Sequence, residues 1–516
     1  MTSRDSDGRA ALSVGAGIFL SKILGFVRER VFAHYFGVGT VSDAWWTALK
    51  IPNVVRNLLG EGTLSASMIP VYAEFLEEGR DEEAARFAGA ALGILTALAG
   101  GVALLGGVLA PQIVGLLFSK FDPETQALTA TLIRILFPMT GLFVISAWSL
   151  GILNSHRTFF ISYVAPVLWN VSMIVAMIGG ATYWGLGGEP ERLVVALGWG
   201  ALVGGVLTLL IQLPWLLPHL NGVRVSLGRG VAGVREAVQA FIPVVAARGV
   251  VNLSSAIDLF LAARLTAGAV SLMGFAQTLA NLPIALFGTG IAAAELPEMS
   301  RMRGEDAELL ARRVRTSAER ALWFLIPSAV GYVIVGDVIV GSLYQTGAFG
   351  PAEVLITWGV LSAYTLGLPA SASSRVLSSA FYALRDTKTP ANAAYVRVAL
   401  SIGIGVALMG PADELGFGML RLGAAGLALG SATGAWIEYG LLTRALGRAI
   451  GRHRPSAASV LRMILASVLA AAVGVGVQLV LPWSHPLIVG TATLVPFAVA
   501  YLGAASLLGH PLPIRR

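Results

Sequence analysis

The chain has no cysteine, few histidines and few charged residues, and each shortage excludes a class of chemistry. With no cysteine among its 516 residues, disulfides, thiolate metal sites and thiol catalysis are excluded. Its six histidines are scattered without a metal-ligand spacing, so we expect no metal site. No Ser-His-Asp set, catalytic carboxylate pair or phosphate-cradling loop stands in a suitable context, so we expect no catalytic residues and no enzyme.

Apolar residues take the place of the missing charge. Charged residues make up 13% of the sequence and hydrophobic residues 56%, and the mean hydropathy is +0.75. Apolar runs of about 20 residues recur from end to end, and each is long enough to span a bilayer as a helix. These runs do not alternate with period two, which favours helices over strands. We therefore predict an all-α integral membrane protein with about fourteen transmembrane helices.

Basic residues gather in alternate connections between the predicted helices. If the N-terminus lies inside, the outer connections hold little basic charge beyond Lys120, Arg192 and Arg421. This asymmetry follows the positive-inside rule and predicts that both termini are cytoplasmic. The net charge of +7 does not indicate nucleic-acid binding, because no soluble basic domain carries it. The first apolar stretch is interrupted by Lys22, so it is interpreted as an uncleaved first helix and not as a signal peptide.

Short segments of the first half recur in the second half at a spacing of 227–230 residues. Leu116–Phe121 is echoed by Leu343–Phe349, Leu153–Thr158 by Ala383–Lys388, and the Gly60-Glu61-Gly62 turn by Gly288-Thr289-Gly290. This predicts a parallel repeat of two six-helix lobes around a central cavity, with residues 1–220 and 221–452 as the lobes. Residues 453–516 have no counterpart and form a C-terminal helix pair.

The main functional signal is a set of charges inside apolar runs. Asp43, Lys50, Arg56 and Glu61 fall in one such run, and each would cost about 2.5–3.5 kcal/mol if it faced lipid near the bilayer centre. On an ideal helix Asp43, Lys50 and Glu61 lie within about 20° of one another, which predicts a polar stripe that faces a cavity. Pro52 can kink this helix, so the direction of Arg56 is not fixed by the pattern.

Several interpretations of these charges remain open. Arginine and lysine could bind an anionic diphosphate headgroup in a water-filled cavity, because guanidinium donors match phosphate oxygens. Alternatively, Asp43, Lys50 and Glu61 could form a static ion-pair network, or some of the charges could reach the lipid headgroups from helix ends. Glu61, beside two glycines, also fits an interfacial turn, and Arg264 fits either the cavity or the interface.

Several segments resemble the MurJ (MviN) lipid II flippase family. They are Ser21–Glu29, Ser42–Trp46, Leu49–Arg56, Glu61–Gly62, Ile69–Pro70, Leu343–Phe349 and Arg385–Pro390. The resemblance covers nearly the whole chain, including the helix count and the last two helices. It implies a member of the MOP superfamily in the bacterial cytoplasmic (inner) membrane. Such a protein moves undecaprenyl-diphosphate-linked muropeptide outward for peptidoglycan synthesis by alternating access.

The resemblance also implies a substrate site. The important cations of the family match Lys22, Arg28, Lys50 and Arg56, and its acidic residue matches Asp43. The diphosphate would bind these cations, and the polyprenyl tail would lie in a groove formed by the last two helices. Membrane lipids and cell-wall synthesis proteins are the expected partners. No cofactor is expected, and the membrane potential, Na⁺ or H⁺ would supply the energy.

The chain departs from the family pattern in its second half. Where the family commonly has an arginine before a proline, this sequence has Thr278 before Pro283. We hypothesise that Arg264 supplies the missing charge and add it to the predicted substrate-binding residues, together with Glu61. The alternative functions are export of another lipid-linked oligosaccharide or small molecule, an intramembrane enzyme acting on polyprenyl phosphates, and a non-transporting scaffold of the cell-wall machinery.

Overall fold

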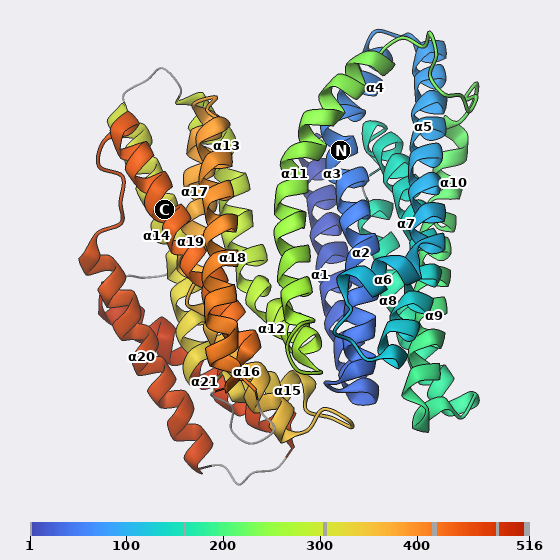
Figure 1. Cartoon of the computed structure of the whole chain (residues 1–516). Helices are drawn as coiled ribbons and strands as arrows, with labels where there is room; N and C mark the ends of the chain where they lie inside the picture. The colour runs from blue at the N-terminus through green and yellow to red at the C-terminus, as the bar shows by residue number, and fades with distance from the viewer. Residues whose placement is uncertain (1–2, 159, 303–306, 415–420, 481–484, 510–516) are drawn as a thin grey trace. The chain divides into compact units, whose positions relative to one another are not determined.

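The structure is a computed structural model that describes residues 3–158, 160–302, 307–414, 421–480 and 485–509. It divides into two compact units, Met1–Phe260 and Leu261–Arg516, which are drawn in Figure 1 from blue to green and from green to red. The described part of the chain contains helices and no strand beyond one isolated bridge, between Thr346 and Phe349. The predicted all-α class is therefore confirmed, whereas the predicted domain boundaries at 220 and 452 stay predictions.

Unit 1 is built around α7, a long helix that contacts α2, α5 and α9. An aspartate fixes the start of α7, because the Asp122 carboxylate accepts hydrogen bonds from the Thr125 backbone N–H at 2.9 Å and from its hydroxyl at 2.6 Å. The helices of unit 1 are α1 (Ser3–Phe36), α2 (Thr40–Leu59), α3 (Glu61–Ser67), α4 (Ile69–Glu77), α5 (Asp81–Val108), α6 (Ala110–Leu117), α7 (Pro123–Ser155), α8 (Phe160–Tyr183), η1 (Leu186–Gly188), α9 (Pro190–Leu210), α10 (Leu213–Leu216), η2 (Leu217–His219) and α11 (Val234–Ala262).

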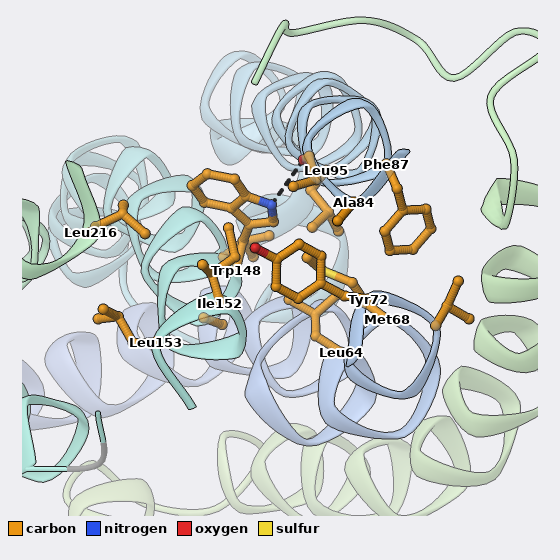
Figure 2. Packing of buried hydrophobic residues seen from close by; sticks show 14 of the residues in the cluster. Leu64, Met68, Tyr72, Ala84, Phe87, Leu95, Trp148, Ile152, Leu153 and Leu216 are labelled. Carbon is orange, nitrogen blue, oxygen red and sulfur yellow. Dashed lines mark hydrogen bonds between the residues drawn. The ribbon is translucent and has the colours of Figure 1, made fainter. Parts of the chain in front are cut away.

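The core of unit 1 lies where α3, α4 and α5 pack against the second half of α7 (Figure 2). Trp148 of α7 is buried there, and its indole N–H donates a 3.0 Å hydrogen bond to the Ala88 carbonyl of α5. Tyr72 lies beside it, and Phe87 belongs to the same buried cluster. Because the indole N–H has a partner, this large side chain adds apolar contact without leaving a buried donor unsatisfied.

Unit 2 places α14, α17 and α19 next to one another, and the last two helices pack on α14 and α15. At the interface of α18 and α19, a Cβ on Gly430 would stand 2.6 Å from the Gly405 nitrogen, so glycine allows this close approach. The helices of unit 2 are α12 (Ala269–Pro283), the π-helix η3 (Ile284–Thr289), α13 (Gly290–Arg301), α14 (Ala307–Ile334), α15 (Gly336–Tyr344), α16 (Pro351–Thr365), α17 (Leu368–Ala383), α18 (Lys388–Glu414), α19 (Gly423–Ile450), α20 (Ala457–Val480) and α21 (Pro486–Leu507).

Many of these helices have the length and composition of membrane spans. Within the described residues, nine helical stretches are long and apolar enough to cross a membrane, or ten if α14 and α15, which meet at a bend of 82°, form one span. The helix α2 is not among them, because every 18-residue stretch of it contains Asp43, Lys50 and Arg56. The charges that the sequence analysis predicted to be functional therefore lower the mean hydropathy of this helix and remove it from the set of apolar candidate spans.

The same helix-ending turn occurs in both units. The two non-glycine residues with positive φ in the described chain are Arg157 (φ 59°), after α7, and Arg385 (φ 62°), after α17. At the first, Thr158 N–H bonds to the Leu153 carbonyl at 2.8 Å, and at the second, Asp386 N–H bonds to the Phe381 carbonyl at 2.9 Å. The turns are 228 residues apart, which is within the spacing of the predicted repeat.

Candidate functional site

Arg28, on α1, is held by three neighbours inside unit 1. Its guanidinium forms an ion pair with Glu29, and donates a 3.0 Å hydrogen bond to the side-chain oxygen of Asn170 on α8. It also lies over the indole ring of Trp169, 5.1 Å from the ring centroid. These contacts fix the position of a predicted substrate-binding cation.

Arg56, on α2, lies over an aromatic ring that contacts Trp169. Its guanidinium is 5.0 Å from the ring centroid of Phe143 on α7. Phe143 in turn meets Trp169 edge to face, with ring centroids 5.7 Å apart. The side chains of Arg28, Trp169, Phe143 and Arg56 therefore form one row that crosses α1, α8, α7 and α2, which we call the arginine–aromatic row.

The sequence analysis missed two residues of the arginine–aromatic row, Phe143 and Trp169, and the Asn170 side chain that accepts from Arg28. Phe143 and Trp169 are apolar residues in apolar helices, so nothing in a single sequence distinguishes them from core or lipid-facing residues. Asn170 was the available signal, because a buried amide in an apolar helix needs a hydrogen-bond partner. The indole nitrogen of Trp169 is buried and has no hydrogen-bond partner among the described residues.

Lys50 and Asp43 occupy the same helix as Arg56. The carboxylate of Asp258, on α11 of the same unit, attracts the Lys50 ammonium group. Asp43 lies in the first turn of α2 with only 2% of its surface exposed. A carboxylate in this position stabilises the positive end of the helix, so Asp43 has a structural role whatever it binds.

The single continuous helix on which the polar stripe from Asp43 through Lys50 to Glu61 was predicted is wrong at its far end. The helix α2 ends at Leu59, Gly60 is extended (φ −88°, ψ −160°), and Glu61 begins the separate helix α3. A Cβ on Gly60 would stand 2.4 Å from the Arg56 carbonyl oxygen, so the break needs glycine. The side chain of Glu61 lies outside the described residues, and its role in binding stays a prediction.

The remaining predicted residues are not among the contacts that define the arginine–aromatic row. Lys22 is an exposed residue of α1. Arg264 is exposed in the connection between α11 and α12, before the helix that carries Thr278. The Thr278 hydroxyl donates to the Gly274 carbonyl of its own helix at 2.9 Å. The proposed compensation of Thr278 by Arg264 is therefore still a prediction.

Unit 2 contains an apolar groove of about 480 Å³. Its walls come from α12, η3, α14, α15 and α21, and they include Phe287, Phe324 and Phe497. The rings of Phe287 and Phe324 stack with centroids 4.3 Å apart. The sequence predicted a lipid groove between the last two helices, whereas here α21 contributes to the lining and the described residues of α20 do not.

A helical membrane protein with positioned arginines in one unit and an apolar groove in the other has the architecture of a polytopic membrane transporter. Solved structures of two kinds of transporter are among those that share its fold. The first is a lipid II flippase MurJ in an inward closed conformation (TM-score 0.79, 22% identity, 96% of this chain and 98% of that chain). The second is an inward-facing multidrug resistance MATE family transporter of the MOP superfamily (TM-score 0.66, 17% identity, 86% of this chain and 98% of that chain).

The family follows from the sequence comparisons. Residues 32–496 match the family described as lipid II flippase MurJ. The probable lipid II flippase MurJ of Rhizobium meliloti is 29% identical over 96% of this chain and 94% of its own length. The chain belongs to the MurJ lipid II flippase family. The predicted family is therefore confirmed, as is the expectation that the chain is a transporter and not an enzyme.

Proposed function

We propose that this chain moves lipid II from the inner to the outer leaflet of the bacterial cytoplasmic membrane by alternating access. The observation that carries the proposal is the arginine–aromatic row, in which Arg28 and Arg56 are fixed by ring and amide contacts. A guanidinium that is already oriented loses less entropy when it binds a phosphate oxygen. The family relationship supplies the substrate class.

In this proposal, Arg28, Arg56, Lys22 and Lys50 neutralise the diphosphate. The indole N–H of Trp169, which has no partner within the described part of the chain, donates to a substrate oxygen. The polyprenyl tail occupies the apolar groove of unit 2, whose walls offer it aromatic and aliphatic contact. Asp43, Glu61 and Arg264 complete the proposed set of binding residues.

We further propose fourteen spans with both termini cytoplasmic. This count includes helices that contain charged residues or a break, in addition to the long apolar helices described above. The energy comes from the membrane potential or a coupled Na⁺ or H⁺, because one charge crossing 100 mV is worth about 2.3 kcal/mol. Cell-wall synthesis proteins are the proposed protein partners.

The test measures outward movement of lipid II in bacteria depleted of their own flippase. The natural chain is compared with Arg56→Ala and with Arg192→Ala, a control that alters an exposed arginine paired with Glu189 at 2.8 Å. We expect transport by the natural chain and the control and none by Arg56→Ala, at equal membrane levels. If the natural chain inserts normally but moves no lipid II, the proposal is wrong and another lipid-linked substrate or a scaffold role takes its place.

A further inference from the structure

Four arginines crowd the end of α19 in unit 2. Arg444 and Arg448 lie on the last turns of the helix, and Arg452 and Arg454 lie in the connection to α20. All four are exposed, and the ion pairs found among the described residues include none of them. Some exposed arginines elsewhere in the described residues do have acidic partners, as Arg80 has in Glu78 and Glu83. The four positive charges therefore repel one another without local compensation.

The four arginines surround a pocket of about 320 Å³. The pocket exists because Gly451, with φ +77°, ends the helix and turns the chain back beside its last turns. Its remaining lining comes from Thr443, Gly447, Gly451 and His453.

The pocket also has two buried polar groups without partners. His453 is 2% exposed and Thr443 is 4% exposed. The His453 Nε2 and the Thr443 Oγ1 have no hydrogen-bond partner among the residues that the structure describes. The Nδ1 of His453 lies 2.9 Å from the Gly451 carbonyl, which can only accept, so the proton of the neutral ring is on Nδ1. A buried polar atom left unpaired is costly, which indicates that a ligand completes this site.

We propose that this pocket binds a phosphate group, with the four guanidinium groups around it and Thr443 and His453 at its inner wall. Guanidinium donors match phosphate oxygens in charge and geometry. The Thr443 hydroxyl donates a hydrogen bond to a phosphate oxygen. The Nε2 of His453 either accepts a hydrogen bond from a protonated phosphate oxygen or takes up a proton and donates to an unprotonated one. A metal cation is disfavoured by four positive charges. The carbonyl end of α19 carries about half a negative charge, which is small beside four cations.

Two sources could supply this phosphate group, namely a soluble phosphate compound and the headgroup of an anionic lipid. The site lies in unit 2 and shares no residue with the arginine–aromatic row. A negative result for phosphate binding at this site would therefore leave the proposed transport function untouched.

The experiment uses the full chain and reads ligand binding from the unfolding temperature. In detergent, inorganic phosphate is titrated against chloride at equal ionic strength. In nanodiscs, bilayers of phosphatidylcholine are compared with bilayers that contain phosphatidylglycerol. The test variant is Arg448→Gln with Arg452→Gln, and the control is Arg315→Gln, an exposed arginine of α14 outside the pocket. Thr443→Val is a second test variant, which removes a hydroxyl with little change of shape.

We expect the double variant to need at least about tenfold more ligand for the same stabilisation, because two charge-assisted contacts are lost. We expect a smaller loss in Thr443→Val and none in Arg315→Gln. A response to inorganic phosphate identifies the soluble source, and a response confined to phosphatidylglycerol bilayers identifies the lipid headgroup. No response in either medium overturns the proposal, as does an equal loss in the Arg315→Gln control.

Discussion

Replacing Phe143 with leucine removes the ring between Arg56 and Trp169 and keeps an apolar side chain in its place. The change deletes the contact of Arg56 with a ring 5.0 Å away and the edge-to-face contact at 5.7 Å. A cation–π contact at a half-buried site contributes about 1 kcal/mol, within a range of about 0.5–2 kcal/mol. The aromatic pair contributes about 0.5–1.5 kcal/mol.

Of these two contacts, only the cation–π contact that orients Arg56 should affect the binding of lipid II. A loss of about 1 kcal/mol raises the dissociation constant of lipid II about fivefold. The assay is binding of fluorescent lipid II to the purified chain in detergent. Phe121→Leu is the matched control, because Phe121 stacks on Phe118 at 5.6 Å in the same unit, away from the arginine–aromatic row. We expect that control to bind lipid II as the natural chain does.

A double-mutant cycle separates orientation of Arg56 from direct contact with the substrate. If Phe143 acts through Arg56, Phe143→Leu should have no further effect on binding in an Arg56→Gln background. A fivefold loss that persists in that background would refute the reasoning, because Phe143 would then affect lipid II without the arginine.

Three further predictions concern the break after α2, a histidine pair and a buried glutamate. Gly60→Ala should reduce lipid II transport at unchanged membrane level, because its Cβ would stand 2.4 Å from the Arg56 carbonyl oxygen. Full transport would contradict this, because the chain between α2 and α3 would then accommodate the Cβ. The pKa of His156 lies below its usual 6.5 through burial and then through the charge of His219. The folded state therefore favours the neutral ring, so the unfolding temperature should fall as the pH drops below about 6.5. The fall should be smaller in His156→Gln, and identical plots of unfolding temperature against pH for the two chains would contradict this. Glu295→Gln should cost about 1–3 kcal/mol of stability, because Glu295 is buried and pairs with Arg313 at 2.5 Å; an unchanged urea midpoint would refute this.

The sequence alone was sufficient for the helical class and the family, because long apolar runs and charged motifs are local features. It also named Arg28 and Arg56, whose side chains lie at the two ends of the arginine–aromatic row, although their role in binding stays a prediction. The end of α2 was not predicted, although Gly60 and Gly62 flank Glu61. Extending an ideal helix through these glycines ignored that a glycine can adopt the extended conformation which brings it against the Arg56 carbonyl.

The arginine–aromatic row could not be read from one sequence for a different reason. Phe143 and Trp169 come from separate helices and meet only through tertiary packing. Helical periodicity describes which residues share a face, but it does not state which faces of different helices are in contact. The same limit applies to the pocket at the end of α19, where Gly451 turns the chain back toward its own helix.

The turns at Arg157 and Arg385 bear on how deeply the protein sits in a bilayer. A left-handed backbone favours glycine and costs an arginine about 1 kcal/mol, yet both units have an exposed arginine at this position. Its positive charge lies at the negative end of the helix that it follows, and this attraction stabilises the helix by about 0.3–1 kcal/mol. An exposed guanidinium also resists entry into hydrocarbon, so each arginine would limit how far the end of α7 or α17 can enter a membrane. Glycine at both positions would relax the backbone and let these helix ends slide along the membrane normal.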